Sequence, residues 1–241
     1  MELIGTHTFT VQPFEVDFRG EITLALIISN LLNTAGHHAN ERGFGIKQLN
    51  QSGNTWVLSR LVIEMSRMPQ EGETVKIETW IESVIRSFTQ RNFCIKGEGE
   101  EILGYAKSFW AMINMESRRP ASLAEQHLER FFCDKDCPIE RAGKISVSTE
   151  GDKSYINIKY SDLDINKHLN SAKYVEHILN AFDMEELEGQ TIKRLEMEYL
   201  EECRFGETIQ ITKTKVSGKE YLINMAKESG ETACKSKIFL Q

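Results

Sequence analysis

The sequence has little of what marks a disordered or membrane-bound chain. Only four prolines occur in 241 residues, and there is no Gly/Ser-rich run, so a long disordered linker is not expected. The longest apolar stretch, residues 24–32, is interrupted by Ser29 and Asn30 and is far shorter than the roughly 20 residues that cross a bilayer. We therefore expect a globular chain with its own core and no membrane partner.

Positive charge is also scarce, with 29 basic against 36 acidic residues and a net charge of −7. Such a surface repels phosphate backbones, so nucleic acid is not expected as a partner. The five cysteines are odd in number and show no disulfide-framework or zinc spacing. This favours reduced thiols in a cytoplasmic protein, without a metal or other cofactor. The first 20 residues show no signal-peptide pattern.

An internal repeat organises the chain. Residues 60–77 recur as residues 194–211 without a gap, with identical Arg, Leu, Glu, Gly, Glu, Thr and final Ile. Each copy leads into alternating strands joined by a glycine turn, and each follows an apolar helix, expected at residues 24–34 and 172–182. One helix held against a curved antiparallel sheet buries this pattern economically. The predicted class is therefore α+β, with copies at residues 1–130 and 140–241.

A polar run, DLDINKHLN at residues 162–170, directly precedes the second helix. Alternation places Asp164, Asn166 and His168 on one side of an extended segment, a pattern typical of a site rather than of a core. Asn170 suits the helix N-cap, and the helix start offers N–H groups for a developing oxyanion. The first copy has no histidine in residues 17–23, directly ahead of its helix, so we expect one site, carried by the second copy.

A second polar element, MEYLEEC, lies at residues 197–203 and brings Glu202 and Cys203. Together the two motifs resemble those of the acyl-acyl-carrier-protein thioesterases, a family with a double (tandem) hot-dog fold found in plant plastids and in bacteria. The resemblance covers essentially the whole chain and implies hydrolysis of a fatty-acyl thioester on acyl carrier protein. Since no plastid transit peptide precedes the motifs, a bacterial member is expected.

Transferred position by position, the resemblance implies a catalytic set, namely Asp164, Asn166, His168, Glu202 and Cys203. The family's usual Gln is Lys167 here, and its Arg-Arg pair is Leu200-Glu201. Loss of that basic pair removes the basis for placing a carrier-protein contact there.

Two mechanisms fit this set. In the first, Glu202 and His168 activate water, Asn166 orients the water or the carbonyl, and Asp164 fixes the helix start. In the second, Cys203 is the nucleophile and His168 its base. We favour the water route, because enzymes of this fold generally work through carboxylates and water.

The resemblance also implies that the acyl chain binds in the first copy. Substrate-binding candidates are Trp56, Met65 and Trp110 there and Asn170 in the second copy; Trp80, Phe109 and Met112 are further wall candidates. Aromatic and Met residues at such spacing are also common in cores, and both interpretations stay open.

Other functions remain open on the same residues. They are an acyl-CoA or aryl-CoA thioesterase, a hot-dog 3-hydroxyacyl dehydratase, and a non-enzymatic acyl-binding module. Two fused copies already complete the usual hot-dog pair, so a monomer is sufficient; a homodimer through the sheet edges is the alternative.

Overall fold

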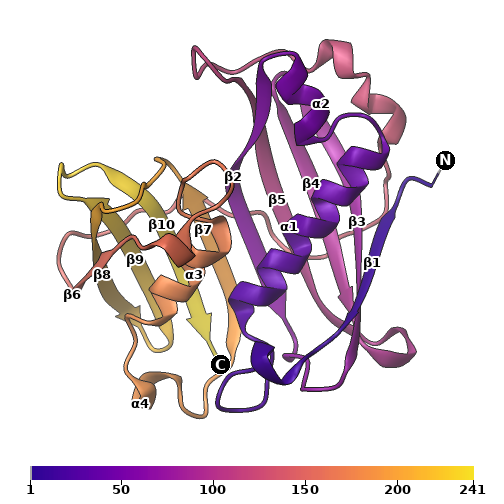
Figure 1. The fold of residues 1–241 in the computed structure, drawn as a ribbon. Helices are drawn as coiled ribbons and strands as arrows, with labels where there is room; N and C mark the ends of the chain where they lie inside the picture. Colours follow the sequence, from indigo (N-terminus) through magenta and orange to yellow (C-terminus); the bar gives the residue numbers. More distant parts are fainter. Residues whose placement is uncertain (1) are drawn as a thin grey trace. The chain divides into compact units, whose positions relative to one another are not determined.

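The computed structural model describes residues 2–241, and the chain divides into two compact units, Met1–Arg141 and Ala142–Gln241. We call them the first half and the second half. Both are built from helices and antiparallel strands (Figure 1). The α+β class predicted from the repeat and the tandem hot-dog architecture implied by the resemblance are both confirmed.

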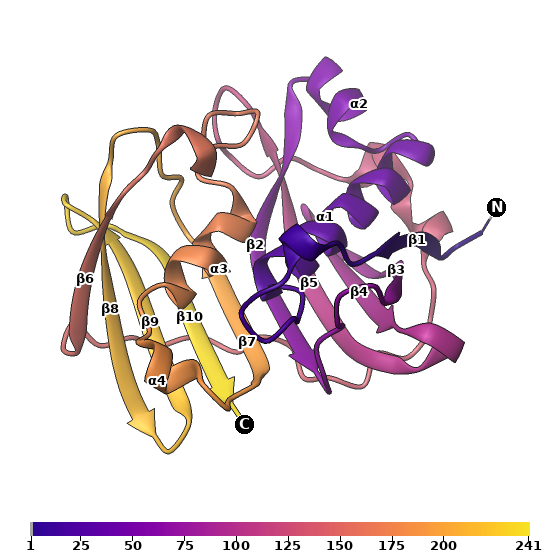
Figure 2. The same ribbon diagram turned by 60° about the horizontal axis from the view of Figure 1, so that its bottom comes forward.

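In the first half a long helix lies along one face of an antiparallel sheet, as Figures 1 and 2 show for α1. The strands are hydrogen-bonded in the order β1-β3-β4-β5-β2. Its elements are β1 Gly5–Thr10, η1 Pro13–Glu15, α1 Leu24–Glu41, α2 Ile46–Gln51, β2 Asn54–Met65, β3 Thr74–Ile85, β4 Phe88–Lys96, η2 Glu98–Glu100, β5 Ile102–Asn114, η3 Ala124–Gln126 and η4 Leu128–Phe131. Ile27, Ile28 and Leu31 of α1 are fully buried.

Helix α1 is longer than the predicted span of residues 24–34. It begins after Thr23, whose side chain accepts a hydrogen bond from Leu26 N–H, and it ends at Glu41 before Gly43, which has a φ of +80°. The prediction stopped where the apolar run stopped. The last two turns are helical because Ala35, His38 and Ala39 are buried, and His38 finds polar partners inside the half.

The second half repeats this plan, with the order β7-β10-β9-β8-β6. Its elements are β6 Asp152–Asn157, η5 Tyr160–Asp162, α3 Ser171–Leu179, α4 Met184–Leu187, β7 Ile192–Tyr199, β8 Thr208–Ser217, β9 Glu220–Lys227 and β10 Thr232–Leu240. Val175 and Ile178 of α3 are fully buried, as helical spacing predicted.

One predicted strand is shifted. The alternation of Ile156, Ile158 and Tyr160 in the sequence predicts a strand over residues 155–160 with these three facing inward, but β6 ends at Asn157 and Tyr160 is 86% exposed. The chain instead enters the 3-10 turn η5, which is stabilised because Lys159 N–H donates to the Asp162 carboxylate at 2.7 Å. Ile158 is buried, so only the last inward position was wrong.

The sequence repeat coincides with the repeat in topology. Residues 60–77 supply the end of β2 and the start of β3, and residues 194–211 supply most of β7 and the start of β8. Even the turn is repeated, since Gly72 N–H donates to Val11 O and Gly206 N–H donates to Ile158 O, both at 3.0 Å. Both glycines have a φ of +83°, which explains why this residue type recurs there.

A histidine near the end of a helix can carry a positive charge that suits the helix dipole, but His38 does not. It is buried, its Nε2 donates to Leu3 O at 3.1 Å, and its Nδ1 accepts from Arg91 Nη1 at 3.1 Å. Burial, together with the charges of Arg91 and Arg42, lowers the pKa of His38 to about 3. The ring is therefore neutral at physiological pH.

This burial predicts acid sensitivity. Because the unfolded chain protonates His38 near pH 6.5 and the folded protein does so only near pH 3, stability is lost as the pH falls through that window. From pH 7 to pH 5 the loss from this group is about 2 kcal/mol. Urea unfolding of wild type and His38→Gln at both pH values measures it. Equal pH dependence in the two proteins would contradict a neutral buried His38.

Candidate active site

The predicted polar run forms a tight turn between η5 and α3. The Asp164 carboxylate accepts hydrogen bonds from the backbone N–H of Asn166 at 2.8 Å and of His168 at 3.0 Å. Asp164 N–H in turn donates to His168 O at 2.8 Å, and Lys167 has a φ of +64°. Asp164 therefore holds the backbone conformation that presents the neighbouring side chains.

His168 and Glu202 are brought together at this turn. His168 Nε2 lies 3.2 Å from Glu202 Oε2, and both side chains are partly exposed. Leu169 N–H donates to Cys203 O at 2.8 Å, and His168 forms a backbone bridge with Arg204. The segment after β7 is thus tied to the turn, which makes a histidine–carboxylate pair that a substrate can reach.

Asn166 and Asn170 play different structural parts. Asn166 is exposed, and within residues 2–241 its side-chain amide has no hydrogen-bond partner. Asn170 is the N-cap of α3, and its side chain accepts from Ala172 N–H at 2.9 Å. Its carbonyl accepts from Lys173 and Tyr174, at 2.8 and 3.3 Å.

The helix start is therefore less open than the sequence suggested. Of the first-turn N–H groups, only that of Ser171 lacks a partner in the described part of the chain. A developing oxyanion could be met by this one donor rather than by several.

Cys203 is buried and meets Tyr174 rather than the His168–Glu202 pair. Its side chain is 0% exposed, and the Tyr174 hydroxyl donates to its Sγ at 3.3 Å. Burial raises the pKa of the Cys203 thiol. No hydrogen bond joins Cys203 to His168 among the described residues, whereas the preceding residue, Glu202, meets the ring.

The first half contains the same turn without the same side chains. The Asp17 carboxylate accepts from the N–H of Arg19 at 2.8 Å and of Glu21 at 3.4 Å, and Gly20 has the positive φ that Lys167 has in the second half. Arg19 pairs there with Asp17 at 2.6 Å and Glu21 at 3.4 Å. Glu21 thus takes the place of His168, which leaves this turn without the histidine.

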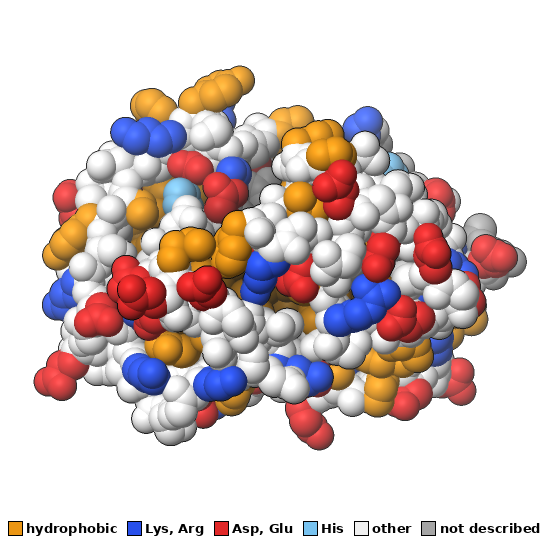
Figure 3. Space-filling view, turned by 90° about the horizontal axis from the view of Figure 1, so that it is seen from below, with side chains coloured by type: hydrophobic (Ala, Val, Ile, Leu, Met, Phe, Trp, Pro, Cys, Tyr) orange, Lys and Arg blue, Asp and Glu red, His pale blue; other side chains and the backbone are white. Residues whose placement is uncertain are grey.

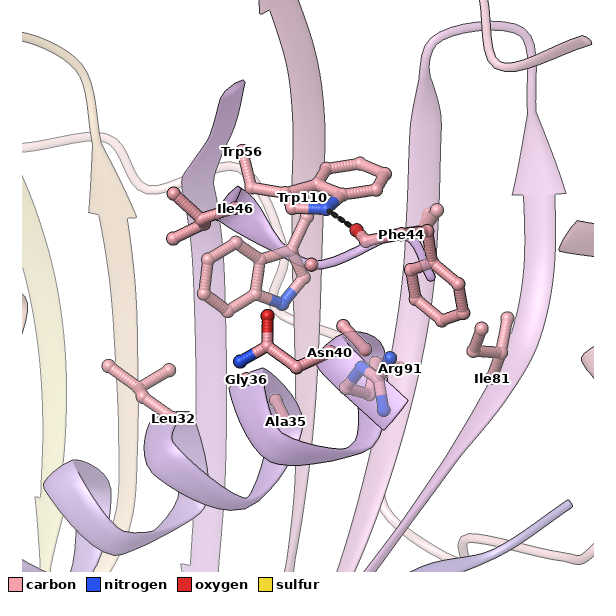
Figure 4. Close-up of a pocket in the computed structure, with 13 residues that line it drawn as sticks. Leu32, Ala35, Gly36, Asn40, Phe44, Ile46, Trp56, Ile81, Arg91 and Trp110 are labelled. Carbon is pink, nitrogen blue, oxygen red and sulfur yellow. Dashed lines mark hydrogen bonds between the residues drawn. The ribbon is translucent and has the colours of Figure 1, made fainter. Parts of the chain in front are cut away.

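The first half has a pocket of its own, of about 580 Å³ including its open mouth (Figure 4). It is bounded by the second part of α1, the segment leading into α2, and strands β2 to β5. Trp56 and Trp110, two of the substrate-binding candidates, line it. Met65 does not line it, because this residue is 1% exposed and packs closely against Gly104 in the core. Trp80 and Met112 are also buried in the core and do not line the pocket.

Comparison with known proteins identifies the family. Residues 3–131 match the model of the acyl-ACP thioesterase N-terminal domain, where ACP is acyl carrier protein, and residues 145–241 match that of the C-terminal domain. The chain belongs to the acyl-ACP thioesterase family. The chain divides into its two halves between these two matched ranges, after Arg141.

Solved and curated members of the family are similar over most of this chain. An acyl-ACP thioesterase from Bacteroides thetaiotaomicron is 42% identical, with a TM-score of 0.95, and the match covers 99% of this chain and 98% of that one. The palmitoyl-acyl carrier protein thioesterase of Gossypium hirsutum is 27% identical over 96% of this chain. The 12:0-ACP thioesterase of Umbellularia californica, at 22% identity and a TM-score of 0.88, shows the fold.

The chain spans only part of its plant relatives. It covers 59% of the Gossypium hirsutum protein and 61% of the palmitoyl-acyl carrier protein thioesterase of Arabidopsis thaliana.

Sequence reasoning missed one polar pair in this acyl-ACP thioesterase family member. His177 Nε2 of α3 lies 3.2 Å from Asp162 Oδ1, and Asp162 is buried. Asp162 also stabilises η5, because its carboxylate accepts a hydrogen bond from Lys159 N–H. The missed signal was spacing, since Asn170, Tyr174 and His177 share one helix face. The pair fastens η5 to α3 and so holds both ends of the site turn.

Residues 2–241 contain neither a cluster of metal-ligating side chains nor a helix that could span a membrane. The His, Cys, Asp and Glu side chains do not gather in threes or more where a metal ion could be held. The helices are too short or too polar for any to pass through a membrane. Acidic and basic side chains are interspersed on the face that Figure 3 shows.

Proposed function

We propose that this chain hydrolyses fatty-acyl thioesters of acyl carrier protein and releases the free fatty acid. The observation that carries the proposal is the contact of 3.2 Å between His168 Nε2 and Glu202 Oε2, on a solvent-accessible turn of a chain whose halves both match the family. A histidine–carboxylate pair can take a proton from water and return it to a leaving group.

The chemical steps follow from this pair. Water attacks the thioester carbonyl carbon while the Glu202–His168 pair removes its proton, which gives a tetrahedral oxyanion. The carbon–sulfur bond then breaks, and the proton moves to the departing thiolate. We assign to Asn166 the role of orienting the carbonyl or the water, and to the Ser171 N–H, which lacks a partner in the described part of the chain, that of donor to the oxyanion.

The burial of the Cys203 side chain and its hydrogen-bond partner support the water route. A nucleophilic cysteine acts as the thiolate, and burial disfavours that form here. The Tyr174 hydroxyl, which is itself buried, is its hydrogen-bond partner rather than His168. We propose that Cys203 supports the core beneath the turn.

Cys203→Ala should therefore keep kcat within about threefold of wild type, while stability falls by about 1–2 kcal/mol because a small buried group is lost. Steady-state thiol release and urea unfolding measure the two effects. A hundredfold loss of kcat in a folded variant, with an acyl adduct on Cys203 in wild-type protein by intact mass, would instead favour the covalent route.

We further propose that the pocket of the first half receives the acyl chain. The face of α1 turned to the pocket carries small side chains, Ala35, Gly36 and Ala39, between Leu32 and Asn40 (Figure 4). A glycine inside a helix costs about 1 kcal/mol relative to alanine. A Cβ at Gly36 would meet no atom within 4 Å, so core packing does not demand glycine at this position. Open space for a ligand is a physical reason for glycine at position 36.

The test of the reaction is thiol release from a panel of acyl thioesters on acyl carrier protein, compared with the same acyl groups on coenzyme A. Higher kcat/KM on the carrier protein supports the proposal, and higher kcat/KM on coenzyme A supports the acyl-CoA alternative. Loss of water from a 3-hydroxyacyl thioester without thiol release would favour a dehydratase. Binding without turnover would favour an acyl-binding module. Cytoplasmic location and a monomeric or homodimeric state stay predictions.

A further inference from the structure

A buried cation faces the pocket of the first half. Arg91 lies on β4, is 5% exposed and is among the residues that line the pocket (Figure 4). Its Nη1 contacts His38 Nδ1 at 3.1 Å and Thr79 Oγ1 at 3.3 Å. In the described part of the chain, no carboxylate lies within ion-pair distance of Arg91, and its Nη2 and Nε have no hydrogen-bond partner.

Other buried charges in the first half do have partners. Glu78 contacts Lys96 at 2.8 Å and also pairs with Lys135. Arg42 pairs with Glu41 at 3.2 Å and donates to the His38 carbonyl. Arg91 differs from these groups in lacking a counter-charge among the described residues, and burial together with the like charge of Arg42 lowers the pKa of Arg91.

An uncompensated buried charge is costly, and a ligand that supplies an acceptor offsets that cost. The two contacts of Arg91 occupy one nitrogen of a guanidinium that carries five N–H donors. Most of the remaining pocket wall is apolar, with Leu32, Phe44, Trp56 and Trp110. The pocket thus combines an apolar wall with unused strong donors at one place.

We infer that the pocket selects acyl chains that carry an oxygen acceptor away from the thioester, and that Arg91 binds this oxygen. The inference rests on the proposed function, in which the turn of the second half carries the reaction and the pocket of the first half receives the acyl chain. The chemical class is a fatty acyl chain with a hydroxyl or carboxylate oxygen. Arg91 is a specificity-determining residue in this scheme.

The binding test uses fatty-acid methyl esters of one chain length, plain, hydroxylated at successive carbons, or carboxylated at the far end, because the head carboxylate of a free acid could itself bind Arg91. Trp56 and Trp110 line the pocket, so tryptophan fluorescence reports occupancy. We expect wild type to bind at least one oxygenated ester about tenfold more tightly than the plain ester. Equal or weaker binding of every oxygenated ester would overturn the inference, and this arm needs no variant.

Two variants locate the effect. Arg91→Met removes the donors at similar length and should abolish the tenfold preference, while Arg91→Lys keeps a charge with fewer donors and should retain part of it. A preference that survives in a folded Arg91→Met protein would overturn the role of Arg91.

The matching carrier-protein thioesters separate this inference from the proposed reaction. If the plain and oxygenated thioesters are both hydrolysed and the oxygenated one has the higher kcat/KM, both stand. If the plain thioester is hydrolysed with a kcat/KM equal to or higher than that of every oxygenated one, the inference falls and the reaction stands. If none is hydrolysed, the reaction falls, and the binding preference alone decides the inference.

Discussion

Glu202→Gln and His168→Ala should each lower kcat for thioester hydrolysis by about 10²- to 10⁴-fold, the range that a positioned general acid–base supplies. The physical reason is the contact between His168 Nε2 and Glu202 Oε2, through which both groups share one proton-transfer task in the proposed mechanism. Because residues that act as a unit are not additive, the double variant should be little slower than either single variant. Rates of thiol release from an acyl-carrier-protein thioester measure all three.

The first half offers a matched control for this experiment. Glu21 occupies the position of His168 in the equivalent turn, held by Asp17 in the same way. Glu21→Ala should leave kcat within about threefold. If it lowers kcat as much as His168→Ala does, or if both active-turn variants keep wild-type rates while folded, the site has been assigned to the wrong residues.

Gly36→Leu should shorten the preferred acyl chain by about two to four carbons. The new side chain would enter open pocket space rather than collide with the protein, since a Cβ there meets nothing within 4 Å. Each methylene that loses its burial costs the long substrate about 0.8 kcal/mol, so kcat/KM for the longest good substrate should fall roughly 10- to 100-fold while shorter chains are spared. A chain-length profile of kcat/KM measures the shift.

Stability separates this effect from damage to the core. Leucine is a better helix former than glycine by about 0.5–1 kcal/mol, so the variant should be at least as stable as wild type in urea unfolding. Asn33→Leu, at an exposed position of the same helix, is the control and should leave the profile unchanged. An unshifted profile in a stable Gly36→Leu protein would mean that the acyl chain does not use this pocket.

Much of the fold was predictable because it is encoded twice. The gap-free repeat of residues 60–77 in residues 194–211 marks two copies of one unit, and the structure gives both copies the same strand order. The strand near residues 155–160 was misplaced because its alternation continues past Asn157. A local capping bond between Lys159 and Asp162 ends the strand, and alternation carries no information about such a bond.

The candidate site was predictable in composition but less so in geometry. The run at residues 162–170 marked the turn, and the pairing of His168 with Glu202 agrees with the proposed roles. His177 was overlooked because one histidine on a helix is usually structural, and only its contact with buried Asp162 shows what it holds.

The sequence by itself determined the duplicated architecture, the location of the polar turn ahead of the second helix and the family of the chain. These are local or repeated patterns, which survive without knowledge of long-range contacts. The tertiary structure decided that Glu202 rather than Cys203 meets His168, that His38 is neutral and that Met65 is core. It also decided that Arg91 lies beside a pocket with no carboxylate within ion-pair distance in the described part of the chain. Each of these depends on contacts between segments far apart in the chain, such as the hydrogen bond from Leu169 to Cys203, and on burial, which changes the energy of a charge.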